Sequence, residues 1–178
     1  MNQNIPAGIS VFEARGRSYE NLFSTTKNEV DWDCRIRSRK TASFGMPYNY
    51  SGLTYSSMDF PGFINKIIED IFPIVGYRAN NCLINFYDSG ASAMGFHSDR
   101  TDILAPLTGI TILSLGDSRT MRFKNKITGE TIDFFMKPNS FLHMSAEMQH
   151  DWLHAILADP KNTSQRISIT FRCMRGYL

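Results

Sequence analysis

The amino-acid sequence predicts an α+β fold that is mainly β, an antiparallel sandwich or jelly roll braced by one helix in its N-terminal half. The 178 residues, 42% of them hydrophobic, are enough for one well-buried core and do not require a second domain. One amphipathic helical pattern precedes Gly76, and a succession of short β-rich runs, separated by Gly, Pro, Asn and Asp, follows it. We therefore expect a single domain over residues 1–178, with residues 1–28 as a less certain N-terminal extension.

The expected helix runs from Asp59 to Val75. Its apolar residues recur at three- and four-residue spacing, which is typical of a helix with one buried face. They are Phe60, Ile64, Ile67, Ile68, Ile71, Phe72 and Val75. Asp59 is the expected N-cap, and Pro61 is compatible with the first turn, where no backbone N–H is needed.

Seven runs rich in β-branched and aromatic residues follow the helix and are expected to be strands. They are Cys82 to Tyr87, Gly109 to Leu115, Thr120 to Lys126, Thr131 to Met136, Ser140 to Met144, Trp152 to Leu157 and Arg166 to Cys173.

The last of these runs alternates strictly. Arg166, Ser168, Thr170 and Arg172 share one face, and apolar residues occupy the other. Two interpretations remain open. The polar face of an outer strand is ordinarily solvated, whereas inside a barrel two arginines would suit an anionic ligand with two carboxylates.

Two further patterns carry chemistry. Asn85 and Tyr87 place an amide and a phenol on one face of a strand. His97 and Asp99, two residues apart at an extended strand end, can point at one metal ion. With a histidine from a distant strand they would form a facial triad that leaves three iron positions open. His-x-Asp is common by itself, so its meaning depends on its surroundings.

Composition sets limits on partners and location. A net charge of +2 does not by itself imply nucleic-acid binding, so phosphate contacts would need local clusters of cations. Two such rows exist, although exposed rows are often only solvated edges. They are Arg35, Arg37 and Arg39 with Lys40 beside them, and Arg122, Lys124 and Lys126.

Three cysteines without framework spacing suggest reduced thiols. No export signal and no apolar stretch of membrane-spanning length is present. We expect a soluble cytoplasmic protein that is a monomer and has no membrane partner.

Several motifs, in their order and spacing from Glu29 to Arg172, resemble the AlkB family of iron(II)- and 2-oxoglutarate-dependent dioxygenases. The main motifs are Asn85-x-Tyr87, His97-x-Asp99, Trp152-x-His154 and Arg166-x-Ser168-x-Thr170-x-Arg172. Others are Tyr48-Asn49-Tyr50-Ser51-Gly52, Ser114-Leu115-Gly116, Arg119-Thr120 and Gln149-x-x-Trp152. The resemblance implies a double-stranded β-helix, in agreement with the strand pattern. It also implies oxidative decarboxylation of 2-oxoglutarate with dioxygen, coupled to oxidation of a substrate C–H bond.

By this resemblance His97, Asp99 and His154 are the iron(II) ligands. His143 and His150 lie close to His154 in the sequence, and only the Trp-x-His match separates them from it. His143 sits in an apolar strand, where a satisfied core histidine is the expected role, and His150 is expected to cap a turn.

The resemblance also assigns the co-substrate contacts. Arg166, helped by Tyr87, would bind the distal carboxylate of 2-oxoglutarate, and Arg172 with Asn85 would meet the carboxylate nearer the iron.

The remaining two polar residues of the last strand are expected to complete this pocket. Ser168 stands where the family usually has Asn, so we expect weaker positioning without loss of binding. Thr170 adds a second hydroxyl group on the same face.

The substrate is less clearly indicated. Tyr48 and Tyr50 match the segment that covers a flipped base in the family, or they simply pack at the rim of the barrel. Repair members place acidic residues after the iron-binding Asp, whereas this chain has Arg100-Thr101-Asp102, with Asp102 as a partial substitute. Residues 32–44 leave no room for the wedge of duplex-specific relatives, which favours single strands.

Three functional hypotheses follow. The first is oxidative demethylation of N-alkylated bases in single-stranded DNA or RNA. The second keeps the chemistry but acts on a small molecule or a protein side chain, because Arg100 could attract an anionic substrate. The third, a non-catalytic binding module, is disfavoured because both the His-x-Asp…His set and the two arginines are intact.

Overall fold

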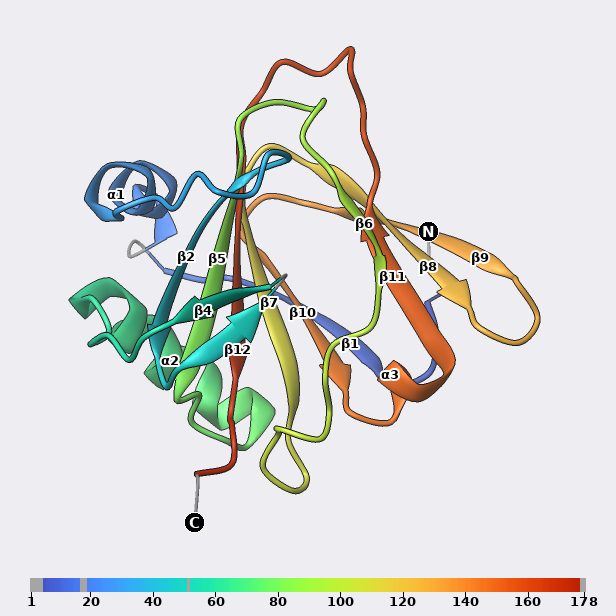
Figure 1. Cartoon of the computed structure of the whole chain (residues 1–178), viewed down its shortest axis with the longest axis horizontal. Helices are drawn as coiled ribbons and strands as arrows, with labels where there is room; N and C mark the ends of the chain where they lie inside the picture. Colours follow the sequence, from blue (N-terminus) through green and yellow to red (C-terminus); the bar gives the residue numbers. More distant parts are fainter. Residues whose placement is uncertain (1–4, 17–18, 51, 177–178) are drawn as a thin grey trace.

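Two antiparallel β-sheets face each other, and the two longer helices lie on the outer side of the larger one (Figure 1). The computed structural model describes residues 5–16, 19–50 and 52–176. Each of the seven predicted strands is present, with its ends within one residue of the expected positions. The sandwich interpretation is therefore confirmed.

The larger sheet has the order β1-β10-β7-β12-β5-β2. Its strands are β1 (Ile9–Glu13), β2 (Lys40–Gly45), β5 (Asn81–Tyr87), β7 (Gly109–Gly116), β10 (Ser140–Ser145) and β12 (Arg166–Arg172). Every residue of β5 and β12 is buried, because both strands have neighbours on each side and are covered on both faces. β1 pairs with β10, so residues 9–13 form the edge of this sheet and are not a detached extension.

The smaller sheet has the order β6-β11-β8-β9. Its strands are β6 (Met94–His97), β8 (Arg119–Asn125), β9 (Thr131–Met136) and β11 (Trp152–Ile156). Along β8, Met121 and Phe123 are buried between the sheets, whereas Arg122 and Lys124 alternate on the outer face. A separate two-stranded hairpin consists of β3 (Tyr48–Tyr50) and β4 (Leu53–Tyr55).

The predicted helix is α2 (Gly62–Val75), which lies on the outer face of the larger sheet (Figure 1). Its four buried isoleucines pack with the apolar residues of that face. It begins later than predicted, because Pro61 has an extended backbone and occupies the N-cap position, so Asp59 does not cap it. A residue before proline is disfavoured in the helical region, which keeps Phe60 out of the helix. At the other end Gly76 adopts φ 80° and donates its N–H to Phe72 O, a left-handed cap.

Two further helices were not predicted from the sequence. α1 (Leu22–Glu29) buries only Leu22 and Thr26, so its apolar periodicity is weak. α3 (Met148–Asp151) is a single turn between β10 and β11. Among the described residues, no helix has both the length and the apolar character needed to cross a bilayer.

The position of α2 on the larger sheet decides between the two interpretations of the last strand. Ile167, Ile169 and Phe171 pack with α2 and the outer face of the larger sheet. The alternating polar face of β12 must then point between the sheets, where Arg166 and Arg172 are 1% and 2% exposed. The solvated interpretation is therefore wrong, and the polar face lies inside the sandwich as the alternative requires.

Candidate metal and co-substrate site

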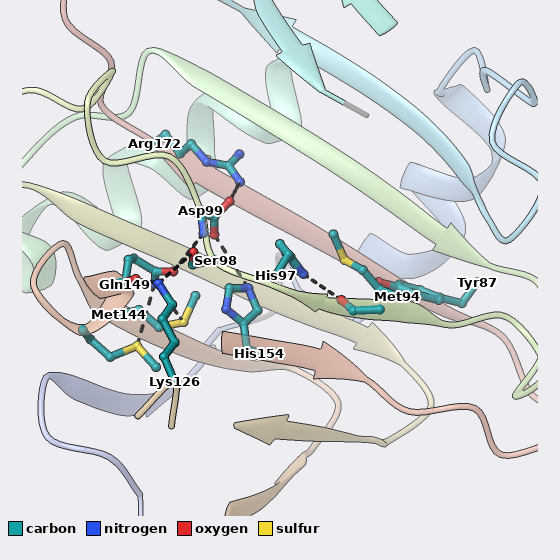
Figure 2. A network of polar contacts seen from close by, with 12 residues as sticks. Tyr87, Met94, His97, Ser98, Asp99, Lys126, Met144, Gln149, His154 and Arg172 are labelled. Carbon is teal, nitrogen blue, oxygen red and sulfur yellow. Dashed lines mark hydrogen bonds and ion pairs between the residues drawn. The ribbon is translucent and has the colours of Figure 1, made fainter. Parts of the chain in front are cut away.

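Three side chains with metal-binding atoms meet between the sheets. His97 ends β6, Asp99 follows it, and His154 lies directly opposite His97 on the neighbouring strand β11. One ligand atom from each lies within 4.8 Å of the others. His154 Nε2 is 3.7 Å from Asp99 Oδ2, and the two imidazole rings are 4.2 Å apart between centroids (Figure 2). Two histidines and a carboxylate at these separations suit one divalent metal ion with open positions.

The electrostatics of the cluster favour metal binding at neutral pH. Burial by itself would raise the pKa of Asp99, but Arg172 and the two histidines bring that pKa to about 2. Burial, reinforced by the neighbouring His97, lowers the pKa of His154 to about 4. The carboxylate is therefore ionised and the His154 imidazole neutral, which are the forms that bind metals.

The two competing histidines lie elsewhere. His143, on β10, has Nδ1 3.0 Å from Thr111 Oγ1 and its ring beside Tyr77. His150 is exposed on α3. Among the described residues neither joins the cluster. His154, the histidine that the Trp-x-His match selected, is the one that lies beside His97 and Asp99.

A narrow cavity between the sheets continues from the cluster. It is lined by the three cluster residues and by all six residues expected to bind the co-substrate. These six are Asn85, Tyr87, Arg166, Ser168, Thr170 and Arg172. The structure therefore brings nine predicted site residues into one cavity.

The surroundings of Arg166 show whether the cavity suits a carboxylate ligand. Its Nε donates to Ser114 Oγ at 3.0 Å, and its guanidinium lies 5.2 Å from the centre of the Tyr87 ring. Neither Nη1 nor Nη2 has a hydrogen-bond partner among the described residues. Burial lowers the pKa of this guanidinium, partly opposed by Tyr87. A buried cation with two unsatisfied donors is costly unless an anion binds there, so the cavity fits a carboxylate.

Arg172 has a different environment from the one expected. Its Nη2 donates to Asp99 Oδ1 at 2.6 Å, and its guanidinium lies 4.8 Å from the centre of the Tyr48 ring. Arg172 is therefore paired with the carboxylate of the cluster in addition to lining the cavity.

Arg39 contacts a residue that lines the cavity, so its placement in a surface row was wrong. Its side chain is 7% exposed, and its Nε donates to Asn85 Oδ1 at 2.8 Å. Residues 36–38 form a turn, so the expected row of alternating arginines on one strand face does not exist. Arg35 pairs with Asp33 on the exposed side of this segment. A buried acceptor such as Asn85, far away in sequence, is not visible in the local pattern.

The second cationic row lies on the outer surface as expected, but all three of its members have contacts within the chain. Arg122 forms an ion pair with Asp133 on β9, and Lys126 Nζ contacts Ser98 Oγ and Gln149 O. Lys124 lies over the Phe96 ring at 5.9 Å.

Of the residues expected to bind the substrate, those that the structure describes do not line one common surface. Tyr48 is 5% exposed and packs on Arg172, so its ring is not an open stacking face. The side chain of Tyr50 lies outside the described part of the structure. Arg100 and Asp102 form an exposed ion pair at 2.5 Å in the segment after Asp99.

Comparison with known proteins agrees with this geometry. A family model described as the 2OG-Fe(II) oxygenase superfamily matches residues 13–172. The chain is 28% identical over 145 residues to the DNA oxidative demethylase ALKBH2 of Homo sapiens, covering 75% of this chain and 56% of that protein. It is 30% identical over 149 residues to an uncharacterized protein of Acanthamoeba polyphaga mimivirus, covering 80% and 76%.

The fold has a solved counterpart. The structure of OsALKBH1 superimposes with a TM-score of 0.69 at 14% identity, covering 96% of this chain and 99% of that chain. The chain spans about half the length of the ALKBH2 proteins that it matches.

Proposed function

The chain belongs to the 2OG-Fe(II) oxygenase superfamily as an AlkB-like member, and we propose that it is an oxidative demethylase of N-alkylated bases in single-stranded DNA or RNA. The observation that carries the proposal is the buried cavity shared by a His, Asp, His cluster and the unsatisfied Arg166 guanidinium. We also propose that residues 1–178 form one catalytic domain.

In this proposal His97, Asp99 and His154 hold iron(II). Iron bound there, together with 2-oxoglutarate and dioxygen, supplies an oxidant for a C–H bond, with succinate and carbon dioxide as co-products. Asp99 contributes a charge that Arg172 keeps ionised, and His154 contributes a neutral imidazole. The smaller sheet sets the separation of the two histidines, because they are directly opposed on neighbouring strands.

The larger sheet provides the co-substrate contacts in the same proposal. Arg166 offers its two free terminal nitrogens to the distal carboxylate, beside the Tyr87 phenol. Asn85 is held in one orientation by Arg39, which leaves its amide N–H groups as the available donors. Ser168 lies opposite Asn85 on the paired strand, close enough to share the binding of one ligand.

One observation supports a nucleic acid as the substrate, and a second favours single strands. The human and bovine relatives are named DNA oxidative demethylases. In residues 32–44 the structure exposes no large apolar side chain of the kind that could wedge open a base stack, and Trp32 instead packs against Phe86.

Incubation with iron(II), 2-oxoglutarate, ascorbate and N-methylated oligonucleotides tests the proposal. We expect mass spectrometry to detect loss of the methyl group from single strands and formation of succinate, with much less from the same sequence as a duplex. His154→Ala is the matched inactive control. If no base loses its methyl group while the protein still turns over 2-oxoglutarate, the substrate class is wrong.

A second candidate keeps the chemistry but uses a small molecule or a protein side chain. It is supported by the burial of Tyr48, which leaves no open stacking face on that ring, and by the exposed Arg100 close to Asp99. Consumption of 2-oxoglutarate that is stimulated by a metabolite extract but not by oligonucleotides would favour this candidate.

A further inference from the structure

Gln149 lies beside the metal cluster without belonging to it. It sits on α3, five residues before His154, and its side chain is 3% exposed. Its Oε1 accepts a 2.9 Å hydrogen bond from the backbone N–H of Asp99 (Figure 2). One chain segment therefore supplies a cluster histidine and also holds the main chain of the cluster carboxylate.

The orientation of the Gln149 amide is set by its surroundings. Its Nε2 points toward two thioether sulfurs, Met144 Sδ at 3.5 Å and Met148 Sδ at 3.7 Å. Thioethers are weak acceptors and cannot donate, so an exchange of the amide oxygen and nitrogen would lose both kinds of contact. Oε1 is consequently directed at the Asp99 N–H.

Lys126 ties the same two segments together from the outside. Its Nζ donates to Gln149 O at 2.7 Å and to Ser98 Oγ at 3.3 Å. It follows β8 in the chain, so it links the connection between β8 and β9 to both parts of the site. We call Gln149 and Lys126 the clamp.

These contacts leave one oxygen of Asp99 for a metal. Its N–H is bound by Gln149, and its Oδ1 is bound by Arg172 at 2.6 Å. Oδ2 is the oxygen that faces His154 Nε2. We propose that the clamp positions the Ser98-Asp99 main chain so that Oδ2 is directed at the metal position before the metal binds.

The inference deepens the proposed function and rests on it in one respect, that the cluster binds a divalent metal. Groups that orient metal ligands without touching the metal typically contribute about 10- to 100-fold to metal affinity, because a loose ligand must be ordered when the metal binds. The clamp residues are positioning residues in this sense.

The affinity of the apoprotein for a metal tests the inference without the substrate that is to be oxidised. Mn(II) is titrated into metal-free protein containing 2-oxoglutarate, and free Mn(II) is measured by electron paramagnetic resonance. Gln149→Met keeps the length and apolar packing but removes the acceptor, and Lys126→Met removes the outer link. We expect each to weaken Mn(II) binding by about tenfold or more.

Matched variants separate positioning from general damage. Gln149→Glu keeps an oxygen for the Asp99 N–H, so its Mn(II) affinity should stay closer to the wild type than that of Gln149→Met. Lys124→Met removes a neighbouring cation that lies over Phe96, and Gln165→Met removes a half-buried glutamine that accepts a hydrogen bond from Lys27. Both should bind Mn(II) as the wild type does.

The outcomes are distinct. Unchanged Mn(II) affinity in Gln149→Met, with a thermal midpoint near that of the wild type, overturns the inference. If Gln149→Met does not fold, Lys126→Met, altered at the surface, decides alone. A wild type that binds no Mn(II) refutes the proposed function and the clamp together, whereas tight binding without demethylation refutes only the substrate class.

Discussion

The site contains a buried cation with little compensation within the chain. Arg166 is enclosed with two unsatisfied nitrogens, whereas the Asp99 carboxylate is paired with Arg172. A group such as Arg166 is retained at a cost to the stability of the fold, which is typical of residues that serve a ligand. Replacement of Arg166 should therefore affect stability and binding in opposite directions.

Arg166→Met is expected to raise the thermal midpoint of the protein without co-substrate, because it removes a buried and unpaired charge. The same change should weaken 2-oxoglutarate binding by about 2–5 kcal/mol, the typical loss for one partner of a buried charge pair. Calorimetric titration of 2-oxoglutarate in the presence of Mn(II), with a melting curve of each protein, measures both effects. A variant that is less stable and binds normally would contradict this role.

His143 gives a pH dependence that is separate from the metal cluster. Burial lowers its pKa below the ordinary 6.5, so below pH 6.5 the unfolded chain binds a proton more readily than the folded chain. The folded state should lose stability as the pH falls from 6.5 to the folded pKa, and the loss is complete below it. Urea unfolding between pH 7.5 and 5 should show a smaller loss for His143→Asn than for the wild type.

At the scale of elements, close backbone approaches determine which strands can pair. Gly45 ends β2 with φ +82°, and a Cβ there would lie 2.1 Å from Asn80 O. The approach lets β2 finish against β5, with Gly45 opposite Asn81. Gly62, in the first turn of α2, has open space around it.

Gly45→Ala should therefore destabilise the fold by about 2–4 kcal/mol, through a strained backbone and a clash with a carbonyl oxygen. Gly62→Ala should do the opposite and stabilise it by about 0.5–1 kcal/mol, because alanine has the higher helix propensity. Chemical unfolding of the two variants measures the difference. Equal stabilities would show that β2 can shift to accept a side chain.

At the scale of the whole molecule, the site joins the two sheets. The metal cluster comes from β6 and β11 of the smaller sheet, whereas the arginines come from β12 of the larger one. A metal and co-substrate that bind only the folded chain must therefore stabilise the sandwich as a unit.

Mn(II) alone, at about 100 times its dissociation constant, should add about 2.7 kcal/mol of stability. For a chain of this size we expect the thermal midpoint to rise by about 5–10 °C. A chelator should reverse the shift, and His154→Ala should abolish it. An equal shift in that variant would place the binding elsewhere.

Much of the fold could be predicted because its signals are local. The seven strands and α2 have regular apolar spacing, and His97-x-Asp99 and Trp152-x-His154 lie within short segments. β1, β2 and α1 were not predicted, because each has a weak apolar pattern or is buried only by contact with neighbouring elements. Arg39 was placed in a surface cationic row and Gln149 was given no role, because their partners lie on segments distant in sequence.

The sequence by itself determined which side chains share a face, since alternation along a strand depends only on the backbone. It placed Arg166, Ser168, Thr170 and Arg172 together, and their faces agree with the structure. Tertiary structure alone decided that this face points inward, because α2 covers the other side of the sheet. It also decided that Arg172 and Gln149 hold Asp99, because those contacts depend on the register of strands that only folding brings together.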